Sequence, residues 1–183
     1  METQETRIGR TARGLLWILV LAAMAVGLLA AVNWLPSLMQ LDFARQYDSI
    51  EEAKRAGGLD TVLVPAYFPE GISWPPSLIL AQKKPYQAVV MEFREAEATE
   101  TVLIVVQSSL QGNDAQLQRI RLSEVKEETE YRLKEKRALL QIGTCDNGMP
   151  CSRMTWQDGA LRCTVLLMSS PFELIKIAES MVR

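Results

Sequence analysis

The residues of this chain with the clearest chemistry are its three cysteines. Cys145 and Cys151 flank the sequence Asp-Asn-Gly-Met-Pro, which is rich in turn-forming residues and can bring two thiols together. In an oxidising compartment such a pair forms a small disulfide loop. The alternative is a three-thiolate metal or redox site that also includes Cys163.

Hairpin geometry helps to choose between these two arrangements. Asp158-Gly159 is a two-residue turn signal. A hairpin closed there would pair three sets of residues: Gln157 with Ala160, Trp156 with Leu161, and Met154 with Cys163. Because side chains alternate along a strand, Cys163 then shares a face with Trp156, while Cys151 points to the other face. We therefore expect a Cys145–Cys151 disulfide and a separate, buried Cys163.

The chain contains no histidine. This excludes serine or cysteine hydrolysis with a histidine base, zinc sites with imidazole ligands, and haem with histidine ligation. Carboxylate pairs or a lysine base remain possible. However, the acidic residues fall mostly in charge-mixed stretches such as 92–100 and 124–135, which are typical of solvated strand faces and turns. We expect no catalytic residue, no metal and no cofactor, and hence a protein that is not an enzyme.

The overall charge argues against nucleic acid as a partner. The chain carries 20 basic and 22 acidic residues, so its composition provides no basic face.

The N-terminal region has the pattern of a membrane anchor. Residues 14–41 carry no charge and follow Arg10 and Arg13. At ~1.5 Å per residue, residues 14–32 alone give a helix of roughly 28 Å, close to the thickness of the bilayer hydrocarbon. The run exceeds the ~7–15 apolar residues of a signal peptide and ends in a poor cleavage pattern, so a retained anchor is favoured over a cleaved one. Trp17 and Trp34 would lie at the two interfaces.

The position of the arginines predicts the orientation of this anchor. Cations beside a span stay on the cytoplasmic side, although the reverse topology is an alternative. We expect a single-pass protein of the inner, cytoplasmic membrane, in contact with lipid through its N-terminal helix. The expected parts are a cytoplasmic tail (1–13), a transmembrane helix (14–38), a juxtamembrane linker with a short helix (39–59), and an extracytoplasmic α+β domain (60–183).

Two helices are predicted outside the anchor. Ser49 and Glu52 form a capping box before residues 50–56, and Gly57-Gly58 ends that helix. Ser170 and Pro171 begin a second helix, whose apolar residues recur at helical spacing: Leu174, Ile177, Ala178 and Met181. Strand character is found in 78–82, 87–94, 101–108, 130–142 with a break, 152–157 and 161–168, whereas 115–126 is ambiguous. Residues 102–106 are apolar on both faces, as in a covered central strand.

A proline-rich segment, residues 62–76, supplies the candidate contact surface. Its prolines preclude a helix and favour a fixed, extended path. Tyr67, Phe68, Ile72 and Trp74 on this segment are suited to a contact surface with a low ordering cost. The alternative for Tyr67 and Phe68, which we favour, is that they close one end of the core. Trp74, beside two prolines, is the better candidate for exposure.

Two motifs resemble those of a bacterial extracytoplasmic domain of unknown function. Residues 64–71 (VPAYFPEG) match its opening, and residues 154–159 (MTWQDG) with 174–181 (LIKIAESM) match its close. The resemblance covers about 60–182 and implies a curved antiparallel sheet with helices on one side, similar to the half-barrel of periplasmic lipoprotein carriers. Members of that family look like accessory or sensor regions of membrane proteins, including anti-sigma-like ones. The cysteine loop departs from the pattern.

These features lead to one expected fold class and one expected function. The fold class is α+β, an N-terminal transmembrane helix followed by a curved antiparallel sheet packed against helices. The function is a non-catalytic binding or interaction module in the cell envelope, whose partner is another envelope protein or an apolar ligand. The alternative is a small accessory or structural subunit of a larger membrane complex.

Overall fold

The computed structural model describes residues 44–96, 100–112 and 117–182, together with Trp17, Val20, Leu21 and 23–27. The chain divides into two compact units, residues 1–40 and 41–183.

In the first unit the described residues are helical and exposed. Trp17 belongs to this group and is 66% exposed. Arg10, Arg13 and Trp34 lie outside the described residues. Within the described part of the chain, no helix has the length and apolarity needed to cross a membrane. Most of the predicted transmembrane helix, residues 14–38, lies outside the described residues, and the part that is described does not show such a span.

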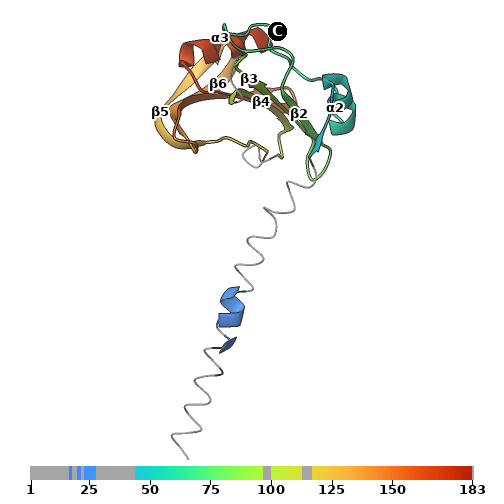
Figure 1. Cartoon of the computed structure of the whole chain (residues 1–183), viewed down its shortest axis with the longest axis vertical. Helices are drawn as coiled ribbons and strands as arrows, with labels where there is room; N and C mark the ends of the chain where they lie inside the picture. The colour runs from blue at the N-terminus through green and yellow to red at the C-terminus, as the bar shows by residue number, and fades with distance from the viewer. Residues whose placement is uncertain are drawn as a thin grey trace, which may run out of the picture. The chain divides into compact units, whose positions relative to one another are not determined.

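The second unit is built on one antiparallel sheet of eight strands, which curves strongly (Figure 1). The strands are β1 (Arg45–Gln46), β2 (Leu78–Gln82), β3 (Ala88–Arg94), β4 (Thr101–Ser109), β5 (Leu122–Leu133), β6 (Lys136–Cys145), β7 (Pro150–Asp158) and β8 (Leu161–Leu167). Their order across the sheet is β1-β2-β3-β4-β8-β7-β6-β5. The predicted α+β class is wrong, because the chain forms mostly antiparallel sheet and the described part of this unit adds only two short helices.

Both faces of the sheet carry apolar side chains at its centre. Strand β4 lies between β3 and β8, with Leu103 and Val105 buried on one face and Ile104 and Val106 buried on the other. This confirms the expectation of a covered central strand. We call the face that bears Leu103 the helix face, because both helices pack on it, and the other the outer face.

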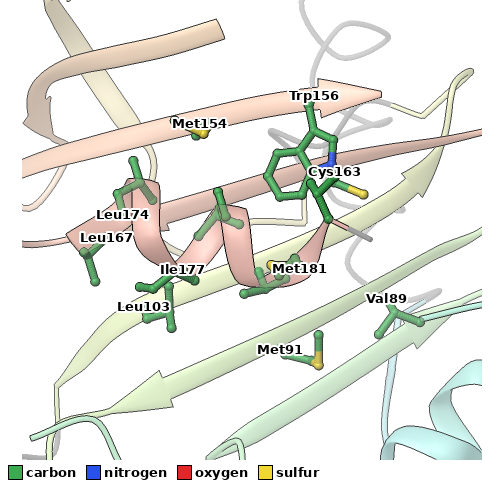
Figure 2. Close-up of a cluster of buried hydrophobic side chains, with 14 of the residues drawn as sticks. Val89, Met91, Leu103, Met154, Trp156, Cys163, Leu167, Leu174, Ile177 and Met181 are labelled. Carbon is green, nitrogen blue, oxygen red and sulfur yellow. The ribbon is translucent and has the colours of Figure 1, made fainter. Parts of the chain in front are cut away.

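Helices α2 (Ile50–Gly57) and α3 (Pro171–Met181) confirm the capping predictions. Ser49 Oγ accepts a hydrogen bond from the Glu52 amide at 3.2 Å. Gly58 ends α2 with φ +69°, a left-handed conformation that glycine adopts without strain. In α3 the expected stripe is buried against the strands, and Figure 2 shows Leu174 and Ile177 near Leu103 and Leu167.

The β7–β8 hairpin forms, but its turn lies one residue further along the chain than predicted. The predicted partner of each strand residue is therefore wrong by two positions. Asp158 pairs with Leu161, and Trp156 with Cys163. The turn centres on Gly159, at φ +62°, and Ala160 rather than on Asp158 and Gly159. Because side chains alternate along a strand, a register change of two residues leaves each side chain on its predicted face. Cys163 therefore still shares the helix face with Trp156 (Figure 2).

The ambiguous stretch 115–126 resolves in part into the start of β5, which lies at an edge of the sheet. Register shifts near Ser123 and Lys126 mark irregularities where β5 meets β6. Gly143 of β6 lies under this point, and a Cβ there would come within 1.8 Å of the Glu124 carbonyl oxygen. A residue larger than glycine would therefore force the two strands apart.

Candidate functional site

Three aromatic rings form a cluster on the helix face, at the end of the sheet where β3 finishes and β4 begins. The Phe68 and Phe93 ring centroids are 5.1 Å apart, and those of Trp74 and Phe93 are 6.2 Å apart in a stacked arrangement. Phe93 is fully buried, whereas Trp74 is 54% exposed. We call Phe68, Trp74 and Phe93 the aromatic platform.

Hydrogen bonds hold the chain that carries the platform. Ser180 Oγ on α3 accepts from the amides of Ala66 at 3.1 Å and Tyr67 at 3.2 Å. Further along, the Ser73 amide donates to the Arg94 carbonyl oxygen at 3.0 Å. The segment that presents Trp74 is thus attached to α3 at one point and to the end of β3 at another.

A polar group beside the platform adds a third attachment. The Tyr67 hydroxyl donates to Glu173 Oε2 at 2.7 Å, and Lys176 Nζ donates to Glu173 Oε1 at 2.9 Å. The bond to Glu173 raises the pKa of Tyr67 above its usual value, and the same bond, with the one from Lys176, lowers the pKa of Glu173. Glu173 in turn raises the pKa of Lys176. The hydrogen bonds thus favour a neutral Tyr67, an ionised Glu173 and a protonated Lys176.

The structure separates the four residues of the predicted contact surface. Tyr67, Phe68 and Ile72 are half-buried and pack against the core, whereas Trp74 projects into solvent. This is the division that the sequence favoured for Tyr67, Phe68 and Trp74.

Sequence reasoning missed three other residues at this end of the sheet. Phe93 underlies Trp74, while Phe172 is 73% exposed and Met149 is 49% exposed. Connectivity places Phe172 and Met149 at this end, because Phe172 lies in the first turn of α3 shortly after β8 ends and Met149 immediately precedes β7. Phe172 does not belong to the apolar stripe of α3 that starts at Leu174. Its position off this stripe is the sequence feature from which its exposure could be predicted.

The cysteines are arranged as predicted. Cys145 and Cys151 form a disulfide with a Cα–Cα separation of 5.8 Å. Both belong to the outer-face cluster, whereas Cys163 is buried in the helix-face cluster. A Cys151–Cys163 pairing is therefore excluded. Among the described residues, no group of three or more histidine, cysteine, aspartate or glutamate side chains is placed to hold a metal ion.

A cavity of about 420 Å³ lies on the helix face at the other end of the sheet, where β4 and β7 finish. Residues 58–63 cross over it, and Leu59, Leu63 and Leu161 supply its apolar lining. The polar lining includes the carboxylates of Asp60 and Asp158 and the ammonium of Lys136. Lys136 and Asp158, cross-strand neighbours at this end, form an ion pair.

Glu92, on the outer face, departs from the expectation of solvated acidic residues in 92–100. Its side chain is 1% exposed. Oε2 accepts a bond from the Thr101 hydroxyl at 3.2 Å and lies 4.0 Å from Arg119, while Oε1 has no partner among the described residues. Burial raises the pKa of Glu92, against the smaller opposing effects of Thr101, Arg119 and Arg94. This carboxyl lies on the face of the sheet opposite both the platform and the cavity.

Comparisons of the chain with protein families, with curated proteins and with solved structures find no match. What the structure itself defines is a mainly-β domain with a single curved antiparallel sheet, an exposed tryptophan at one end of its helix face and a cavity at the other.

Proposed function

We propose that residues 44–182 form a non-catalytic binding domain that takes a protein partner on the aromatic platform. The observation that carries this proposal is the half-exposed Trp74, stacked on the fully buried Phe93. Exposed aromatic anchors supported by buried neighbours are the residues that contribute most to binding at protein interfaces.

The fixed path of the segment strengthens this argument. A partner that buries Trp74 meets a side chain already positioned by the rings of Phe68 and Phe93 and by the Ser73–Arg94 backbone bond. Less side-chain and backbone freedom is therefore lost on binding than at a flexible loop, and preorganisation of this kind raises affinity. Phe172 and Met149 are also exposed at this end of the sheet.

The proposal includes a location outside the cytoplasm. The disulfide between Cys145 and Cys151 favours an oxidising compartment, because cytosolic thiols are kept reduced. The proposed partner is accordingly a protein of the cell envelope.

The lack of catalysis is also part of the proposal. The chain has no histidine, the cavity ammonium of Lys136 is neutralised by Asp158, and the buried Glu92 lies on the face opposite the cavity.

Site-specific photocrosslinking in cells tests the proposed contact. A benzophenone amino acid replaces Trp74 in one variant and Val125 in another, since Val125 on β5 is also exposed, at 45%. The proposal expects a discrete adduct with one envelope protein from position 74 and no such adduct from position 125. Equal labelling from both positions, or none from position 74, would contradict it.

A further inference from the structure

The cavity beneath residues 58–63 has the features of a ligand site that is separate from the aromatic platform. Its volume of about 420 Å³ falls within the range of ~300–1,000 Å³ typical of small-molecule sites. Leucine side chains line it together with the polar groups of Thr61, Gln87 and Ser109. Such a mixture of an apolar lining and a few polar groups favours an amphipathic molecule.

The segment that covers the cavity is fixed at both of its ends. Gln87 Nε2 donates to the Gly58 carbonyl oxygen at 2.8 Å. At the other end, the Leu63 amide donates to Gln107 Oε1 at 2.7 Å, and Gln107 Nε2 donates to the Leu63 carbonyl oxygen at 2.6 Å. Leu59, between these attachments, is only 5% exposed. The wall of the cavity that this segment forms is therefore fixed by the fold.

Two of the three charged side chains around the cavity are paired with each other, and the third is not paired within the described part of the chain. Asp158 and Lys136 neutralise each other in an ion pair. Asp60 is exposed and, within the described residues, makes no hydrogen bond or ion pair. The lining thus has two carboxylates and one ammonium, and the carboxylate of Asp60 is the charge left over for a ligand.

We propose that this cavity binds a small primary amine with an apolar chain. The ammonium of the ligand pairs with Asp60, and its hydrocarbon contacts Leu59, Leu63 and Leu161. A carboxylate ligand is disfavoured, because it would have to displace Asp158 from Lys136 and would face the charge of Asp60 at close range. An uncharged ligand of the same chain length gains the apolar contacts alone.

Titration of the full chain with three six-carbon probes tests this proposal. The probes are n-hexylamine, hexan-1-ol and hexanoate, which share a chain length and differ in the charge of the head group. With leucine methyl groups labelled for NMR, the proposal expects saturable shifts at Leu59, Leu63 and Leu161, and none at Leu174, which belongs to α3 and is buried in the core. The amine should bind about five-fold more tightly than the alcohol, the size of one exposed ion pair, and hexanoate should bind most weakly.

Two variants separate the charge from the cavity. Asp60→Asn should remove the preference for the amine over the alcohol, whereas Asp48→Asn, at an exposed aspartate outside the cavity, should keep it. Leu161→Trp should fill the cavity and abolish the shifts for all three probes. The proposal is overturned if hexanoate binds as well as the amine, if Asp60→Asn keeps the preference, or if no probe gives saturable shifts at the cavity. None of these results depends on Trp74.

Discussion

The side chain of Gln107 and the backbone of Leu63 form a pair of hydrogen bonds, 2.7 and 2.6 Å long, that resembles one rung of a β-ladder. Gln107 belongs to β4 and is fully buried, while Leu63 lies in the irregular segment that crosses the helix face. Among the described residues, the backbone of Leu63 has no neighbouring strand to bond. The side-chain amide of Gln107 therefore supplies both the acceptor for its N–H and the donor for its C=O. The cavity end of the helix face owes its cover to this contact.

Replacing Gln107 with leucine should destabilise the domain out of proportion to the change in volume. Leucine has a similar size but leaves the N–H and C=O of Leu63 without partners, at a cost of about 2–3 kcal/mol in the free energy of unfolding. Denaturant unfolding measures the loss, and hydrogen exchange at Leu63 should speed up in the same variant. Gln157→Leu, at an exposed position near the end of β7, serves as control and should change stability little.

Alanine substitution at two residues of the aromatic platform should lower the folding stability by very different amounts. Phe93 is fully buried, so Phe93→Ala should cost about 3–5 kcal/mol of folding stability. Trp74 keeps more than half of its surface exposed, so Trp74→Ala should cost much less and leave the fold intact. Thermal or denaturant unfolding of the two variants gives the comparison. A loss for Trp74→Ala as large as that for Phe93→Ala would show that Trp74 is a core residue.

The disulfide should contribute a modest amount to stability. Cys145 and Cys151 are six positions apart, and closing so short a loop in the unfolded chain corresponds to about 2 kcal/mol. Unfolding of the Cys145→Ala/Cys151→Ala variant in the absence of reductant measures this contribution. Peptide mapping without reduction should recover the Cys145–Cys151 bridge, and alkylation of Cys163 should require unfolding, since that side chain is fully buried.

Burial of Glu92 predicts a specific pH dependence of folding stability. Burial raises its pKa in the folded state, so the folded protein binds this proton more tightly than the unfolded chain does. The contribution of the protonated Glu92 to folding stability is complete below the pKa that this residue has in the unfolded chain. It is lost as the pH rises through the raised pKa of the folded state. Glu92→Gln keeps the neutral side chain at every pH, and its melting temperature relative to the wild type should therefore be higher at about pH 8 than at about pH 4.5.

The exposed Glu95 provides the matched control for this measurement. Glu95→Gln removes one carboxylate from the same region without emptying a buried site. The difference in melting temperature between the Glu92→Gln variant and the wild type should change with pH as stated. If it does not change, or changes in the opposite direction, Glu92 is not a buried ionisable residue.

Local signals predicted the helices and most strands of the domain. Ser49 and Gly58 mark the ends of α2, and β2 was predicted with its observed bounds, because caps and apolar runs are written in consecutive residues. Face assignments also survived the error in the β7–β8 register, since both strands shifted together. The extent of the sheet was underestimated, because β5 is largely exposed and charged and so lacks the apolar alternation of a typical strand.

The sites were less predictable, since they depend on contacts between distant segments. The exposure of Trp74 followed from its neighbouring prolines, but its support by Phe93 joins residues from the crossing segment and β3. The cavity brings together Asp60, Ser109 and Asp158 from three separate parts of the chain. Glu92 was expected in solvent, and its burial depends on the segment around Arg119 packing on the outer face. None of these relations leaves a periodic or short-range pattern in the sequence.

The affinity of the protein partner for the full chain and for its Trp74→Ala variant tests the proposed function most directly, once crosslinking at position 74 has identified that partner. Loss of a central tryptophan anchor should weaken binding roughly 30-fold, equivalent to about 2 kcal/mol, whereas Val125→Ala should leave the dissociation constant unchanged. If Trp74→Ala binds the partner as tightly as the wild-type protein does, the aromatic platform is not the contact surface.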